Sequence, residues 1–203
     1  MPKKVDHDER RREIAGAVGR IAERKGLARV SFREVAAEAG MSVSLVQHYV
    51  DTKENLLVHT LNHTSATVAE GIASQISALG EDAGPFDRIA AILEAFLPRD
   101  HGSRAAMQVY LQFASAAMAD PVLRSADAFA NGHALIDVLA AELAGIASID
   151  MLAPDVDPPV EARALLSLVL GLSIGMLLDQ TTPEQALAVL QAHLSRLRSP
   201  HDE

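Results

Sequence analysis

The chain has no cysteine and no tryptophan, and aromatic residues make up only 3% of its 203 residues. The absence of cysteine excludes disulfide bonds, thiolate metal sites and cysteine nucleophiles, and it gives no sign of an oxidising compartment. Aromatic residues and runs of β-branched residues, which favour pleated strands, are scarce, whereas alanine and leucine dominate. The composition therefore predicts an all-α fold.

The chain also lacks a long uncharged segment. Its N-terminal sequence, MPKKVDHDERRRE, is charged and has no apolar core of a secretory signal. The longest uncharged run, residues 164–178, has 15 residues, whereas about 20 are needed to cross a bilayer. We therefore expect a cytoplasmic protein with no membrane partner.

Positive charge is scarce overall but concentrated near the N-terminus. The formal net charge is −9, yet residues 1–53 carry 11 Lys and Arg against 8 Asp and Glu, a net of +3, which leaves −12 for residues 54–203. Phosphate affinity depends on local cationic density. This asymmetry fits a DNA-reading head on an acidic body, although an uneven protein surface would also produce it.

Apolar periodicity and the positions of Gly and Pro predict about nine helices. Ser31 with Glu34, and Asp51 with Glu54, have the spacing of capping boxes, and Gly40 is placed to end the second helix. The predicted helices cover residues 8–25, 32–39, 42–50, a long segment from about 51 to 79, 86–97, 103–118, 121–147, 159–179 and 184–197.

The second and third predicted helices have the residue sizes that a helix-turn-helix requires. Ala36 is small where the two helices cross, and Gly40 follows where a tight turn needs positive φ. The apolar positions fall on one face, and the opposite face is short-chained or hydrogen-bonding and carries no acid, as suits a helix in the DNA major groove. The apolar positions are Val35, Ala39, Met41, Val46 and Tyr49, and the opposite face holds Ser42, Ser44, Leu45, Gln47 and His48.

This segment, VSFREVAAEAGMSVSLVQHYVDTKENLL at residues 30–57, resembles the DNA-binding domain of the TetR family of bacterial transcriptional regulators. The matching features are Ser31, Gly40, the helix from Ser42 to Val50, and the Lys-Glu pair followed by leucines at 53–57. Two positions depart from the family's pattern. Gln47 stands where tyrosine is common in the family, and Val50 stands where phenylalanine is common.

The resemblance implies that Ser31, Tyr49 and Lys53 hold DNA phosphates, with Lys53 helped by the positive end of its helix. For Tyr49, packing in the hydrophobic core is an equally weighted alternative to a phosphate contact. The implied candidates for base edges are Arg33, Ser42, Ser44, Leu45, Gln47 and His48, with Gln47 suited to adenine and Arg33 to guanine. The alternative for His48 is that it is exposed to solvent without contacting DNA. Two alternatives are open for Arg10, Arg11 and Arg12, which either follow the DNA backbone or form a solvated face.

Residues 1–55 are therefore expected to form the DNA-binding domain, and residues 56–203 a helical domain for ligand binding and dimerisation. The C-terminal sequence 162–197 is similar to the BetI-like branch of the family. The resemblance implies a homodimer on a palindromic double-stranded operator, released by a small-molecule effector. Activation by the effector would fit the same sequence.

The run 164–178 is apolar nearly all round, so the helix that holds it must be covered on every side. We expect a second copy to provide that cover through the same helix and residues 121–147, in a four-helix interface. A helix buried within its own chain is the alternative. The expected interface residues are Leu165, Leu168, Val169, Gly171, Leu172, Gly175 and Met176.

Several larger side chains near the middle helices are candidates to line an apolar effector pocket, although core packing is an alternative for each. We expect a hydrophobic or weakly polar effector. The candidates are Met107, Tyr110, Phe113, Met118, Phe129 and His133.

No nucleophile elbow, Walker loop or dinucleotide glycine pattern occurs, so we expect neither an enzyme nor a cofactor. His59 and His63 are four residues apart, but no HExxH motif or carboxylate pair completes a metal site, and we expect none. The rival hypothesis is a dimeric helical ligand-binding or adaptor protein without sequence-specific DNA binding.

Overall fold

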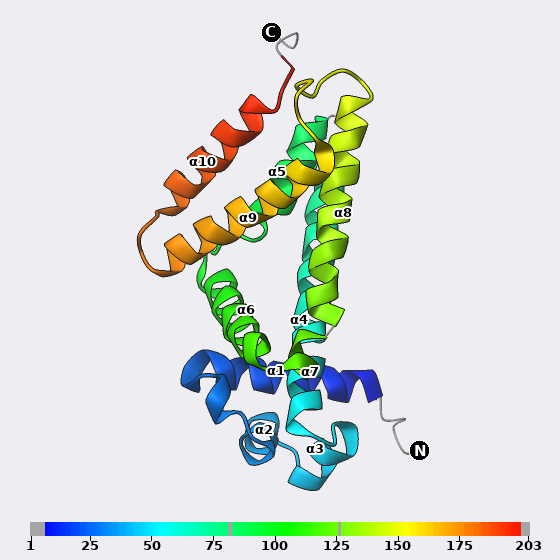
Figure 1. Cartoon of the computed structure of the whole chain (residues 1–203). Helices are drawn as coiled ribbons and strands as arrows, with labels where there is room; N and C mark the ends of the chain where they lie inside the picture. The colour runs from blue at the N-terminus through cyan, green and yellow to red at the C-terminus, as the bar shows by residue number, and fades with distance from the viewer. Residues whose placement is uncertain (1–6, 81–82, 126, 200–203) are drawn as a thin grey trace. The chain divides into compact units, whose positions relative to one another are not determined.

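The computed structural model describes residues 7–80, 83–125 and 127–199, with the backbone alone for residues 127–133. These residues form ten α-helices and one 3-10 helix (Figure 1), which confirms the all-α prediction. The elements are α1 (His7–Lys25), η1 (Leu27–Arg29), α2 (Phe32–Ala39), α3 (Val43–Tyr49), α4 (Lys53–Ala78), α5 (Pro85–Glu94), α6 (His101–Ala119), α7 (Pro121–Arg124), α8 (Asp127–Ala147), α9 (Pro158–Leu177) and α10 (Pro183–Arg196).

The sequence predicted a single helix over residues 121–147, and the structure has two helices there, α7 and α8. Asp120 caps α7, its carboxylate accepting from Val122 N at 2.9 Å and Leu123 N at 3.4 Å. One turn later Ser125 ends the helix, and its hydroxyl donates to Val122 O at 2.9 Å. Such local side-chain hydrogen bonds compete with helix continuation.

The described chain divides into two compact units. Unit 1 holds the chain up to Thr67 together with Ala105–Ala130, and unit 2 holds Val68–Arg104 together with the chain from Asn131 onward. Helices α4, α6 and α8 therefore contribute residues to both units.

The core of unit 1 is formed by the apolar faces of six helices. The stripe predicted for α1 is buried there, and most of α6 adds its apolar face to the helix-turn-helix core. The fully buried members include Ile14, Val18 and Ile21 of α1, Val35 of α2, Val46 of α3, Leu56 and Leu61 of α4, and Phe113 of α6, with Leu123 of α7 also buried.

The core of unit 2 is formed by α5, α8, α9 and α10. Ser173 is completely buried in α9, where its hydroxyl is 2.7 Å from Val169 O and 2.9 Å from Phe96 O. The remaining core is aliphatic apart from Phe86, and includes Ile89, Ile92, Leu139, Leu143, Leu165, Val169, Met176 and Leu190.

Helix α9 is long and apolar enough to cross a membrane by length and composition alone. Its residues Ala162, Leu165 and Val169 are nevertheless completely buried among the other helices of unit 2. The core helix of a water-soluble bundle has this same composition.

Candidate nucleic-acid interface

The turn between α2 and α3 has the geometry that the sequence predicts. Ser31 caps α2, its hydroxyl oxygen accepting from Glu34 N at 3.3 Å. Gly40 ends α2 with φ of 65°, a left-handed conformation that glycine adopts without strain. Met41 N donates to Ala36 O at 2.9 Å, which closes the turn.

Both predicted capping boxes are only partly correct. The Glu34 carboxylate, instead of turning back to Ser31, accepts from Lys25 Nζ at 2.8 Å. Helix α4 is capped by Thr52 rather than Asp51, because Thr52 Oγ1 accepts from Asn55 N at 3.1 Å. Lys25, nine residues from Glu34, decides the first outcome, and Thr52, the direct neighbour of Asp51, decides the second.

Helix α3 separates a packed face from an exposed one. Val46 is completely buried in the unit 1 core, and Tyr49 is half-buried against it. The exposed residues are those predicted to face DNA, and none is acidic. They are Ser42, Ser44, Leu45, Gln47 and His48, and Val43, which the prediction did not name, is exposed as well.

Ser42 and Tyr49 each have local contacts that hold them in place. The Ser42 hydroxyl oxygen accepts from Leu45 N at 3.1 Å, and it lies 3.1 Å from Ser44 Oγ. The Tyr49 ring centroid lies 5.4 Å from that of His48 and 5.6 Å from that of His7. Tyr49 thus packs on its neighbours while part of it faces solvent.

The basic side chains of α1 are largely paired with acids. Arg20 and Arg24 both donate hydrogen bonds to the Glu38 carboxylate. The bond from Arg20, followed by that from Arg24, is the main cause that holds the pKa of Glu38 below its ordinary value. The hydrogen bond from Lys25 is the main cause of a lowered pKa at Glu34.

Three basic side chains beside the helix-turn-helix are engaged by no hydrogen bond or ion pair within the described residues. They are Arg29 in η1, Arg33 in the first turn of α2, and Lys53 at the first position of α4, and all three are exposed. Among the described residues, exposed cations without a hydrogen bond or ion pair are therefore found beside the helix-turn-helix, whereas most of those of α1 pair with acids.

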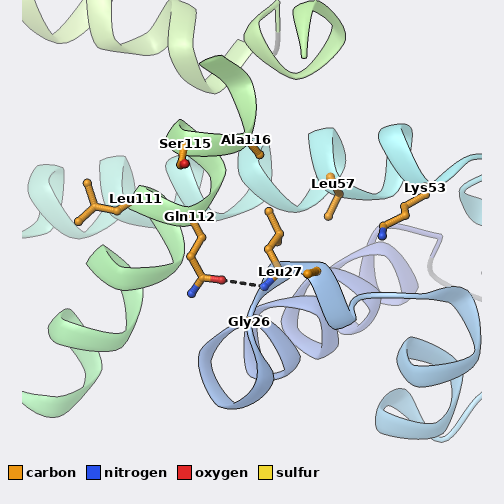
Figure 2. A pocket seen from close by; sticks show the side chains of 9 residues that line it. Gly26, Leu27, Lys53, Leu57, Leu111, Gln112, Ser115 and Ala116 are labelled. Carbon is orange, nitrogen blue, oxygen red and sulfur yellow. Dashed lines mark hydrogen bonds between the residues drawn. The ribbon is translucent and has the colours of Figure 1, made fainter. Parts of the chain in front are cut away.

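An open groove of about 740 Å³ lies within unit 1, beside η1 (Figure 2). Its walls are mostly apolar, from Leu27, Leu57 and Leu111, with the Lys53 side chain at one end. Gln112 of α6 also lines the groove, and its Oε1 accepts from Leu27 N at 2.7 Å. No local pattern singled out Gln112, since its two partners are 85 and 90 residues away.

The predicted effector-pocket residues do not line one cavity in the described part of the chain. Phe113 is 1% exposed in the core of unit 1, whereas Met118 is 78% exposed. Met107 is buried and Tyr110 half-buried, and burial raises the pKa of the Tyr110 phenol. The side chains of Phe129 and His133 lie outside those that the structure describes.

The predicted interface residues of α9 divide between two roles. Leu165, Val169 and Met176 are at most 1% exposed and pack in the core of unit 2 within their own chain. Leu168 and Leu172 are partly buried against the same core.

The two glycines of α9 also differ. A Cβ on Gly175 would lie 2.8 Å from Thr181 Oγ1, so this glycine allows close packing within its own chain. A Cβ on Gly171 would meet nothing within 4 Å, and this residue is exposed. The exposed side of α9 also carries Val160 and Ile174, with Leu178 exposed at its C-terminal cap, and the sequence prediction named none of the three.

His59 has an ordinary structural environment. Its Nε2 lies 3.2 Å from Arg11 O, and burial lowers its pKa. Across the described ranges, no group of three or more His, Asp or Glu side chains is placed to hold a metal ion.

Comparisons with known proteins agree with this architecture. Residues 15–60 match the family model of the bacterial regulatory proteins of the tetR family, and residues 85–199 match that of the C-terminal domain of BetI-type transcriptional repressors. The HTH-type transcriptional regulator PksA of Bacillus subtilis is 27% identical over 201 residues, covering 97% of this chain and 94% of its own.

Solved structures have the same fold. A TetR transcription regulator from Haloarcula marismortui superposes with a TM-score of 0.81 at 22% identity, covering 94% of this chain and 99% of its own. A structure from Saccharomonospora viridis, solved in complex with choline, has a TM-score of 0.75 at 22% identity, covering 93% of this chain and 94% of its own. With a matched helix-turn-helix and a BetI-type C-terminal domain over more than half its length, the chain belongs to the TetR family of transcriptional regulators.

Proposed function

We propose that this protein is a cytoplasmic repressor that binds a palindromic operator as a homodimer and leaves it when a small molecule binds. Residues 1–55 provide DNA binding, and residues 56–203 provide dimerisation and the effector site. The observation that carries the proposal is the exposed, acid-free face of α3, with the unpaired cations Arg33 and Lys53 in the adjoining helices.

Phosphate contacts are assigned to Ser31, Tyr49 and Lys53. The Ser31 oxygen accepts a hydrogen bond from the first turn of α2, which leaves its hydroxyl hydrogen to donate to a phosphate. Lys53 is the first residue of α4, where the helix dipole adds to its positive charge. Such contacts fix the register of the protein on DNA but do not read sequence.

Base contacts are assigned to the exposed face of α3 and to the start of α2. Gln47 has the paired donor and acceptor that match adenine, and the Arg33 guanidinium matches guanine. Leu45, 37% exposed, offers an apolar contact for a thymine methyl group. The remaining proposed base contacts are Ser42, Ser44 and His48.

The dimer interface is assigned to the exposed apolar side of α8 and α9. Val160 is 65% exposed, Ile174 41%, Leu178 61%, and Val138 of α8 48%. Water-exposed apolar residues on α8 and α9 of unit 2 fit a face covered by a second copy. Two-fold symmetry then requires a palindromic operator with half-sites about one helical turn, roughly 34 Å, apart.

Substitutions on two exposed positions of unit 2 test the dimer. Ile174→Asp should give a monomer in analytical ultracentrifugation, because the carboxylate would be buried at the interface. Val189→Asp on α10, which is 44% exposed, is the matched control and should stay dimeric. Equal sedimentation of the two variants would contradict this interface.

Effector release follows from linkage. A ligand that binds the DNA-free form more tightly must weaken operator binding by the same factor. The choline complex of the similar Saccharomonospora structure supports a small-molecule effector for this fold.

The first experiment is a mobility-shift titration against the DNA upstream of the protein's own gene, with unrelated DNA as control. Nanomolar, saturable binding is expected for the specific fragment alone. Lys53→Gln should weaken binding and reduce the slope of log K against log salt by about 2 per dimer, at ~0.9 for each lost phosphate contact.

Lys25→Gln is the matched control, because it removes a cation of the same unit that already pairs with Glu34. This variant should keep the wild-type slope. Binding no tighter than to unrelated DNA, confirmed by selection from a random library, would favour the rival adaptor function.

A further inference from the structure

The chain enters the helix-turn-helix through the turn at residues 26–30, which follows α1. Gly26 has a φ of 81°. Gly26 N donates to Ala22 O at 2.9 Å, Arg29 N to Gly26 O at 3.1 Å, and Val30 N to Leu27 O at 3.1 Å. Among the described backbone hydrogen bonds, Leu27 N has no acceptor.

One side chain of α6 supplies that acceptor. Gln112 Oε1 accepts from Leu27 N at 2.7 Å, and Gln112 Nε2 donates to Ala22 O at 3.3 Å. A single amide thus binds the backbone on both sides of Gly26, and Figure 2 shows its bond to Leu27 N. Its own helix is held in the same core by Val109 and Phe113, so the amide is presented from a fixed support.

We propose that Gln112 is a positioning residue for DNA binding. It holds the turn after α1 and thereby fixes the position at which the helix-turn-helix begins. The inference rests on the proposed function, because it assigns a residue to operator binding. Gln112 makes no contact with DNA in this proposal.

The turn lies directly before residues that are proposed to contact DNA. Leu27 is four residues before Ser31, the cap of α2, and six before Arg33. Val30, between them, is 1% exposed in the core. If the Leu27 amide loses its acceptor, the turn relaxes and the positions of Ser31 and Arg33 become less fixed, so ordering them costs part of the binding energy.

The test compares Gln112→Met with Gln108→Met in the full-length protein. Methionine has nearly the shape of glutamine but makes neither hydrogen bond, and Gln108 is exposed one turn earlier on the same helix. Hydrogen exchange at the Leu27 amide should become about tenfold faster in Gln112→Met, because a protecting bond is lost. Gln108→Met should match the wild type.

Operator affinity should fall about tenfold in Gln112→Met while the salt slope stays unchanged, because no phosphate contact is removed. Gln112→Glu keeps an acceptor for Leu27 N, and should restore slow exchange and part of the affinity. A merely structural residue would instead lower the thermal midpoint and leave operator affinity below that temperature unchanged.

Wild-type exchange at Leu27, or wild-type operator affinity, in Gln112→Met would overturn the proposal. If the wild-type protein bound no operator, the proposed function would fail and this role with it. The exchange measurement would still report whether Gln112 holds the turn, so the two failures are distinguishable.

Discussion

Replacing Phe113 by alanine separates a core role from a ligand-pocket role. Phe113 is 1% exposed and packs in the core shared by α6 and the helix-turn-helix. Truncation of such a buried phenylalanine costs about 3–5 kcal/mol, through lost apolar burial and the cavity left behind. For a unit of below about 100 residues, roughly 4–8 °C is lost per kcal/mol, so we expect the melting temperature of unit 1 to fall by about 12 °C or more.

Peptide-resolved hydrogen exchange is the assay, because it reports stability for each unit separately. Protection should fall across α1–α4 in Phe113→Ala and much less across α9 and α10. Phe86→Ala is the matched control, since Phe86 is 2% exposed in the core of unit 2. It should give the opposite pattern, with the largest loss of protection in α9 and α10.

Unchanged protection of α1–α4 in Phe113→Ala would refute the reasoning. That outcome would mean that Phe113 adds little to the core of unit 1, and it would return this residue to the effector pocket. Operator binding at low temperature should remain measurable in the variant, because Phe113 makes no proposed DNA contact.

Three further substitutions test single contacts. Ser173→Ala leaves the partly buried Phe96 carbonyl without its side-chain donor, and should lower the free energy of unfolding by about 1–3 kcal/mol in urea titration. Glu38→Gln removes a carboxylate whose pKa is lowered by two arginines of α1. A carboxyl group with a lowered pKa in the folded state stabilises the fold at pH values above its ordinary pKa of 4.5. This stabilisation is lost as the pH falls through the pKa of the folded state, so the variant should lose less stability on acidification than the wild type. Gly175→Ala brings a Cβ to 2.8 Å from Thr181 Oγ1 and should destabilise by about 1–3 kcal/mol, with recovery when Thr181→Ala is added; full stability of the single variant would contradict the close packing.

The sequence alone determined the all-α fold, the helix-turn-helix and its exposed face. Ser31, Gly40 and Ser42 act on neighbouring residues through caps and a left-handed turn, so their effect does not depend on distant parts of the chain. Helical periodicity then fixes which side of α3 is buried by Val46 and which side is exposed.

Spacing rules were insufficient where another side chain, adjacent or further along the chain, competed for the same contact. The capping boxes at Ser31 and Asp51 followed from spacing, but Glu34 pairs with Lys25, and Thr52 takes the capping position of α4. At each helix start, the expected and the observed arrangement differ by a single hydrogen bond. Such a bond contributes about 1 kcal/mol to stability, and contacts with neighbouring groups readily outweigh it.

Only the tertiary structure decided which apolar residues pack together. The run 164–178 is apolar nearly all round, so periodicity gave no signal to separate buried Val169 from exposed Ile174. The place of α6 was equally hidden, because Phe113 and Gln112 contact α1 and η1 across more than 80 residues of sequence. Hydrophobic burial is non-directional and specifies that a side chain is covered without specifying by what, and the packing of the whole fold supplied that choice.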